Sequence, residues 1–108
     1  MSSLSDSILN EALAAYVQTF PRKERLSEFI ASQVLAQNSA TIESNLQKVV
    51  ADTESYLYAQ SGGVRWSKSF EQELHSHVHD LNPWLSSVGF KSLLGFSGWL
   101  CWHEGLNA

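Results

Sequence analysis

The chain has 108 residues, a formal net charge of −4 with its histidines neutral, and a single cysteine. This length is typical of one domain, so we expect a single helical domain over residues 1–108. Acidic balance and dispersed basic residues argue against a nucleic-acid partner, because Lys and Arg contacts to phosphate supply most non-specific affinity for nucleic acids. Charged residues make up only 17% of the chain and hydrophobic residues 44%. A small protein with so few charged residues has little polar surface, which favours a partner that buries part of its apolar surface.

The cysteine content and the first residues predict a cytoplasmic protein. Cys101 has no second cysteine to pair with, and it lies in the most apolar part of the chain, which is typical of a buried, unreactive thiol in a reducing compartment. The N-terminal stretch carries Asp6 and Glu11 and lacks the basic cluster of a signal peptide.

The first two helices are predicted by apolar residues at helical spacing. The first carries Ile8, Leu9, Ala12, Leu13, Tyr16, Val17 and Phe20. Residues 3–6 form a candidate capping box before it, and Pro21 ends it or starts the next helix. A second helix is predicted from about Arg22 to Gln37. Its apolar stripe consists of Leu26, Phe29, Ile30 and Val34.

Two further helices flank the clearest turn signal in the chain, Gly62-Gly63. The third follows a break at residues 38–41 and runs to about Gln60, with one apolar face of Ile42, Leu46, Val49, Val50, Thr53 and Leu57. The fourth is predicted to begin at a capping box of Ser69 and Gln72. Its stripe of Phe70, Leu74, Val78 and Leu81 is stopped by Asn82-Pro83.

The segment from Trp84 to Trp102 is apolar on every side when placed on a helix, and Lys91 is its one charge. Such a helix is either the centre of a bundle or a membrane span. Lys91 and four serines argue against a span. We therefore predict an all-α bundle of four to five helices with a central apolar C-terminal helix, in which Leu94 belongs to the core.

Three glycines, Gly89, Gly95 and Gly98, lie inside this predicted helix. Each costs about 1 kcal/mol relative to alanine. The sequence leaves two explanations open: close approach of a neighbouring backbone, or a break near Gly95 that divides the segment into two shorter helices.

Glu71, His75 and His79 are the sharpest candidates for chemistry, because spacings of four residues place them on one side of the fourth helix. Two histidines four apart are a metal-ligand spacing, but a third ligand must come from elsewhere, and His103 or Glu104 are candidates. A solvated polar face is the simpler interpretation. We predict no catalytic, cofactor-binding or metal-binding residues and no bound cofactor.

The pattern favours protein–protein interaction over catalysis. Tryptophan and other aromatic residues are common in cores and at interfaces, and Trp99 and Trp102 lie three positions apart, so that they would line one cleft. We predict a small acidic adaptor, regulator or self-associating module, a homodimer or a protein with a protein partner, and not an enzyme. The alternative is a metal- or small-ligand-binding helical protein that uses Glu71, His75 and His79.

Overall fold

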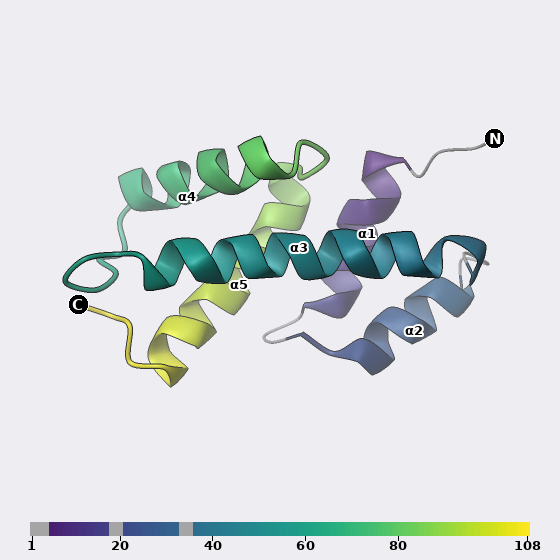
Figure 1. The fold of residues 1–108 in the computed structure, drawn as a ribbon, viewed down its shortest axis with the longest axis horizontal. Coiled ribbons are helices and arrows are strands. Elements are labelled where there is room, and N and C mark those ends of the chain that lie inside the picture. Colours follow the sequence, from purple (N-terminus) through teal and green to yellow (C-terminus); the bar gives the residue numbers. More distant parts are fainter. Residues whose placement is uncertain (1–4, 18–20, 33–35) are drawn as a thin grey trace.

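The computed structural model describes residues 5–17, 21–32 and 36–108 (Figure 1). Over these residues the chain forms the predicted all-α bundle, elongated to 46 × 25 × 18 Å. Its helices are α1 (Asp6–Tyr16), α2 (Lys23–Ser32), the short 3-10 helix η1 (Ala36–Asn38), α3 (Ser39–Tyr58), α4 (Lys68–Leu81) and α5 (Ser87–His103).

Helix α3 is the spine of the bundle. Its 20 residues extend about 30 Å, and it packs against α1, α4 and α5. Figure 1 shows α1 and α2 beside its N-terminal half, and α4 antiparallel to its C-terminal half. Its buried side consists of the six residues predicted from periodicity: Ile42, Leu46, Val49, Val50, Thr53 and Leu57.

Serine side chains cap three of the helices. Ser5 accepts a hydrogen bond from the backbone N–H of Ile8 at 3.2 Å and is the N-cap of α1, while Ser3, the first residue of the predicted capping box, lies outside the described residues. Ser67 accepts from Phe70 N–H at 3.0 Å, so the predicted start at Ser69 is wrong by two residues, because Ser69 already lies inside α4. Ser86 caps α5, which leaves Trp84 outside that helix.

The predicted stripes differ from the core at a few positions. Leu81 is 46% exposed, because α4 ends at this residue, and Leu94 is only half-buried. The second helix, α2, is described as far as Ser32, and the predicted end at Gln37 is wrong because Gln37 lies in η1. Phe20 and Val34, which were predicted on apolar stripes, lie outside the described residues.

Helix α5 contributes seven buried residues, more than any other helix in the described part of the chain. It packs against α1 and α3, and it runs through Gly95 without interruption, so the alternative of a break there is wrong. Only one side of α5 is buried, however, and the opposite side lies in solvent. In the described residues no helix has both the length and the hydropathy of a membrane span.

A buried asparagine joins α1 to the start of α5. Asn10 is 4% exposed. Its amide nitrogen donates to the carbonyls of Asp6 at 2.7 Å and Trp84 at 2.8 Å, and its oxygen accepts from Ser86 N–H at 2.9 Å. A Cβ at Gly89 would collide with this Asn10 oxygen, so Gly89 is explained by close packing inside the chain.

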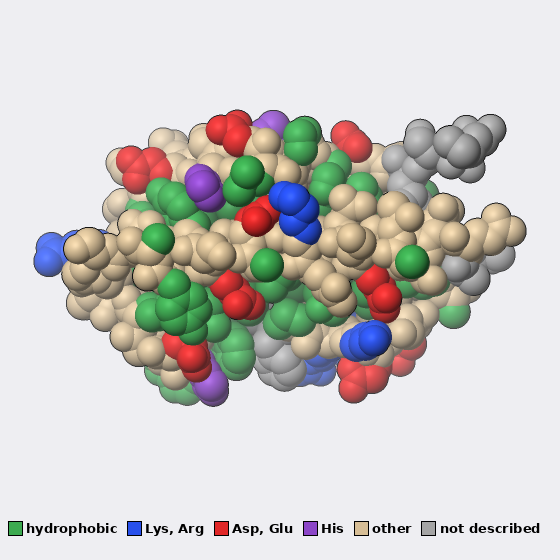
Figure 2. Space-filling model, in the orientation of Figure 1, with side chains coloured by type: hydrophobic (Ala, Val, Ile, Leu, Met, Phe, Trp, Pro, Cys, Tyr) green, Lys and Arg blue, Asp and Glu red, His purple; other side chains and the backbone are tan. Residues whose placement is uncertain are grey.

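A polar network joins α3 to the end of α4. Lys48 donates to Asp52 at 2.7 Å and to the carbonyl of Leu81 at 3.0 Å. The buried Asn82 amide donates to the same Asp52 carboxylate at 3.0 Å. Burial alone would raise the pKa of Asp52, but the hydrogen bonds from Lys48 and Asn82 outweigh it and lower that pKa below its usual value. Elsewhere on this face, charged side chains are dispersed (Figure 2).

Candidate functional site

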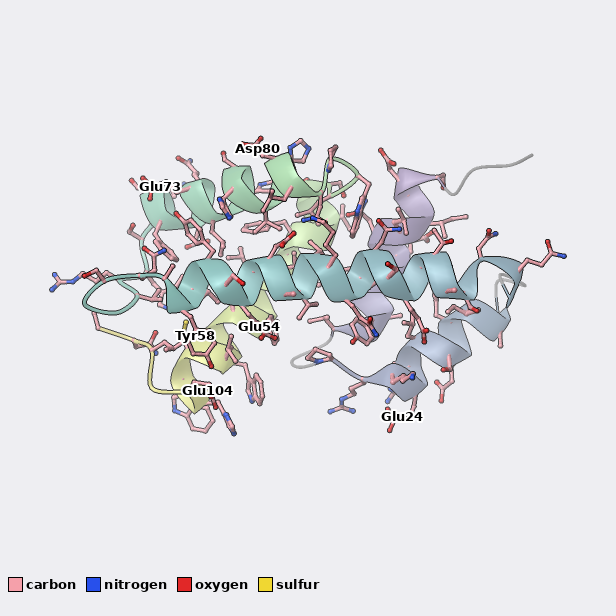
Figure 3. The ribbon with its side chains drawn as sticks, in the orientation of Figure 1. Glu24, Glu54, Tyr58, Glu73, Asp80 and Glu104 are labelled. Carbon is pink, nitrogen blue, oxygen red and sulfur yellow. The ribbon has the colours of Figure 1, made fainter. Side chains whose placement is uncertain are left out.

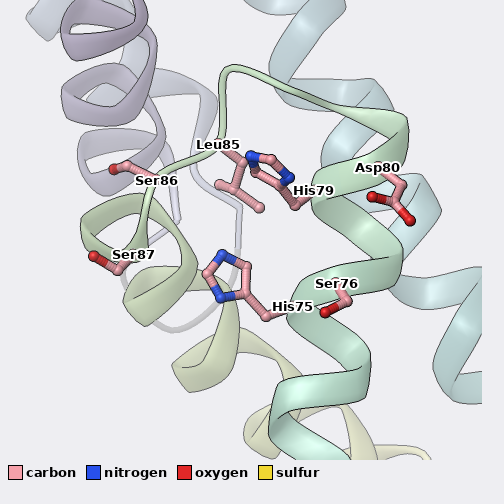
Figure 4. A pocket seen from close by; sticks show the side chains of 7 residues that line it. All are labelled: His75, Ser76, His79, Asp80, Leu85, Ser86 and Ser87. Carbon is pink, nitrogen blue, oxygen red and sulfur yellow. The ribbon is translucent and has the colours of Figure 1, made fainter.

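The predicted histidine pair lines a hollow between α4 and the start of α5 (Figure 4). The hollow has a volume of about 380 Å³, and its lining is His75, Ser76, His79, Asp80, Leu85, Ser86 and Ser87. The rings of His75 and His79 lie 6.1 Å apart between centroids and nearly perpendicular. Figure 4 shows both rings pointing toward the 85–87 segment and Asp80 pointing away from it.

The remaining residues of the predicted metal set lie elsewhere. Glu71 lines a different hollow, with Trp66, Leu94 and Gly98. His103 stacks on Trp99 at 4.8 Å near the C-terminal end of α5. His75 instead stacks on Phe90 of α5. Phe90 precedes His103 by 13 residues in α5, which corresponds to about 20 Å along the helix axis. His75 and His79 therefore line one hollow and Glu71 lines another, while His103 and Glu104 lie at the far end of α5.

The environment of His75 is that of a packed side chain. Its ring lies parallel to Phe90, with centroids 4.2 Å apart and an interplanar angle of 8°. Burial, together with the neighbouring charge of His79, lowers the pKa of His75 below its ordinary value of 6.5. Among the described residues, no group of three or more His, Cys, Asp or Glu side chains is placed to hold a metal ion. In this part of the chain the two histidines offer at most two ligands.

A second candidate site is the solvent side of α5. Five residues form it, and we call them the open face: Val88, Lys91, Gly95, Gly98 and Trp102. They recur at spacings of three and four, which keeps them within a sector of about 80° around the helix axis. Val88 is 67% exposed and Trp102 is 73% exposed, the two highest values among the large apolar residues described as exposed.

Packing within the described part of the chain does not explain the two glycines of the open face. A Cβ added at Gly95 or at Gly98 would meet no atom within 4 Å, so neither glycine is required by packing, in contrast to Gly89. Each still costs the helix about 1 kcal/mol relative to alanine. Of the two explanations that the sequence left open, close backbone approach remains for these positions, and no neighbour within the described residues supplies it.

Trp66 lies beside the open face, and Glu104 ends α5 on the side of Tyr58. Trp66 is 37% exposed, and it lines a hollow of about 300 Å³ together with Leu94 and Gly98. Glu104 follows the last turn and accepts a hydrogen bond from Tyr58 at 3.1 Å (Figure 3). It accepts a second one from His103 at 2.8 Å. The His103 and Tyr58 hydrogen bonds lower the pKa of Glu104, which keeps its carboxylate charged near neutral pH.

Trp99 and Trp102 do not line one cleft together, contrary to the prediction. Trp99 is half-buried, tilted against Phe96 at 6.4 Å and covered by His103. Trp102 projects into solvent. Cys101, which stands between these two tryptophans in the sequence, is fully buried, as predicted. Its burial raises the pKa of the thiol.

The class that fold and surface define is a small helical bundle with one exposed, largely apolar helix face. Comparison of the chain with protein families, with curated proteins and with solved structures gives no match. The open face could not be predicted from the sequence, because α5 is apolar on every side and its pattern does not show which side is buried. The glycine pair Gly95 and Gly98 was the one available signal.

Proposed function

We propose that this chain is a cytoplasmic protein–protein interaction module and that the open face of α5 is its contact surface. The observation that carries the proposal is the exposure of Trp102 and Val88 on the same side of one helix as two unpacked glycines. Exposed aromatic residues are frequent energetic anchors of protein interfaces. The free, buried Cys101 supports a reducing compartment.

The surface favours a protein over a small ligand. A small-ligand site is a concave cavity with a few converging polar groups, whereas the open face is a helix side whose one charged group is Lys91. A helix side of this kind fits another helix, since regularly spaced apolar positions and small residues let two helices pack closely. We therefore expect the partner to contact the open face of α5 with a helix of its own.

Site-specific photocrosslinking in cells that naturally produce the chain tests the proposal. We place p-benzoyl-phenylalanine at Trp102, where one aromatic group replaces another, and at Gln47 as a control on the exposed side of α3. We expect discrete protein adducts from position 102 and few from position 47. Val88→Asp, at a position that is mostly exposed, is expected to remove the adducts from position 102 without unfolding the chain.

Three results would each contradict the proposed function. The first is the absence of protein adducts from position 102. The second is equal adduct yields from positions 102 and 47, and the third is adducts from position 102 that persist in the Val88→Asp background; the last two would indicate contact by chance. An adduct with a second copy and an adduct with a different protein both support the function.

A further inference from the structure

We infer that the occupant of the open face is a second copy of this chain, with the two α5 helices packed antiparallel about the point midway between Gly95 and Gly98. This inference rests on the proposed function, since it names the partner of the same surface. The exposed positions 88, 91, 95, 98 and 102, together with Gly105 just after the helix, are spaced 3, 4, 3, 4 and 3 residues apart. Such a series is the same in both directions.

Reversal of this series pairs residues that suit one another. An antiparallel two-fold contact places Gly95 opposite Gly98 of the second copy, so that neither side chain holds the backbones apart. It also places Lys91 opposite Trp102, where an ammonium group and an indole ring form a cation–π contact. Val88 then lies beside Gly105, which has a φ of +66° and no side chain. Each pairing occurs twice because of the two-fold symmetry.

Charge favours this direction over the parallel one. The antiparallel arrangement sets Lys91 of one copy 11 residues along the axis from Lys91 of the other, which is about 16 Å. It also sets the partially positive start of one helix beside the partially negative end of the other. A parallel pair would place Lys91 beside Lys91 of the second copy, and the two cations would repel.

The open face carries no carboxylate of its own. The four surplus negative charges of each copy are therefore carried outside the surface that the two copies share. Their mutual repulsion is weakened by salt, because it acts over longer distances than the contacts within the face. We expect a dimer that is retained, or becomes tighter, as the salt concentration rises to physiological values.

Sedimentation equilibrium of the purified full chain tests the pairing. We expect a reversible monomer–dimer equilibrium, and we expect the Gly95→Ala/Gly98→Ala double variant to dimerise about tenfold more weakly, because two methyl groups enter the closest part of the contact. A face that is merely apolar would dimerise as well or better with the added methyls. Gln47→Ala on α3 is the matched control and is expected to leave the dissociation constant unchanged.

Disulfide trapping tests the direction. Gly95→Cys and Gly98→Cys are separate variants at exposed positions with open space, and the native Cys101 is buried. In an equal mixture, oxidation is expected to give mainly the disulfide between position 95 of one copy and position 98 of the other, since these face each other. A predominance of 95–95 and 98–98 disulfides would overturn the antiparallel arrangement.

A wild-type chain that sediments as a monomer at concentrations on the order of 1 mM overturns the inference. The proposed function is judged separately, by the adducts at position 102. Adducts with a different protein together with a monomeric chain would reject self-pairing and keep the interaction function. No adducts and no dimer would reject both.

Discussion

Helices α3 and α5 each bury one side against the bundle, but they differ in what they expose. The solvent side of α3 carries Gln47, Lys48, Ala51 and Ser55, and at its last turn Tyr58, which is 52% exposed and donates its hydroxyl hydrogen to Glu104. Apart from this tyrosine, the side has the composition of an ordinary solvated helix surface. The solvent side of α5 carries Val88, two glycines and Trp102, with Lys91 as its one charge. A chain that exposes an apolar side on its most apolar helix has a surface suited to a further contact.

The two sides of α5 are expected to differ most in their contribution to stability. Leu93 is fully buried, so Leu93→Ala should lower the free energy of unfolding by about 2–5 kcal/mol. Leu46→Ala on α3, also fully buried, should do the same, whereas Val88→Ala should change it by less than about 0.5 kcal/mol. Urea unfolding followed by circular dichroism, at concentrations where the chain is monomeric, measures all three. A Val88→Ala effect as large as that of Leu93→Ala would show that the open face is part of the core.

Asn10 should be the next most sensitive position, because it holds the start of α5 against α1. Asn10→Ala leaves Ser86 N–H and the carbonyl of Trp84 without their buried partner, and we expect a loss of about 1–3 kcal/mol. Asn45→Ala is the matched control, since the Asn45 amide donates only to the Thr41 carbonyl in its own helix in an exposed setting. Equal urea midpoints for the two variants would contradict the structural role of Asn10.

The glycines of α5 should respond to alanine with opposite signs. Gly95→Ala and Gly98→Ala are each expected to stabilise the monomer by about 0.4–1 kcal/mol, because alanine favours the helix and a Cβ meets nothing there. Gly89→Ala should destabilise it, since the added carbon collides with Asn10. Thermal unfolding of the three variants at low concentration checks the signs. A destabilising effect at Gly95 would indicate packing within one copy.

Acidification should lower the free energy of unfolding in two steps, each smaller than the effects of the substitutions above. The folded-state pKa of His75 is lowered from 6.5, so the unfolded chain binds this proton more readily and stability falls as the pH drops below about 6.5. The pKa of Asp52 is lowered from 3.8, so its contribution is present above that value and is lost as the pH falls below it.

Two variants assign these steps. His75→Phe keeps a ring against Phe90 and should flatten the first step in a series of urea midpoints measured from about pH 8 to about pH 3. Asp52→Asn should flatten the second step, with the first unchanged. Midpoints of His75→Phe that keep the full wild-type slope between about pH 7 and about pH 5 would assign the first step to other histidines.

Periodicity predicted the helices and most of the core, and the reason is visible in α3. There, apolar residues at spacings of three and four occupy one side only, so the buried side could be assigned in full. In α5 the same rule fails, because Leu94 and Val88 are as apolar as the buried Leu93. Which of them faces the bundle depends on how α1 and α3 pack. Asn10 was also missed, since a single polar residue in a helix gives no sign that it will bridge to Trp84 and Ser86.

The histidine pair shows a second limit of spacing. A separation of four residues placed His75 and His79 on one side of α4, as predicted, and the same rule added Glu71. In the structure, Glu71 lines another hollow with Trp66, Leu94 and Gly98, whereas His75 and His79 line the hollow beside residues 85–87. The sequence gives the side of a helix on which a residue lies, but not the helix that covers it.

We propose that the open face of α5 is a contact surface rather than an incomplete core. The most direct test is the dissociation constant of the purified chain by sedimentation equilibrium, measured for the wild type and for the Gly95→Ala/Gly98→Ala variant together with the unfolding free energy of each monomer. We predict a more stable monomer and a dimer weakened about tenfold. A double variant that is less stable as a monomer and dimerises as well as the wild type would contradict the account.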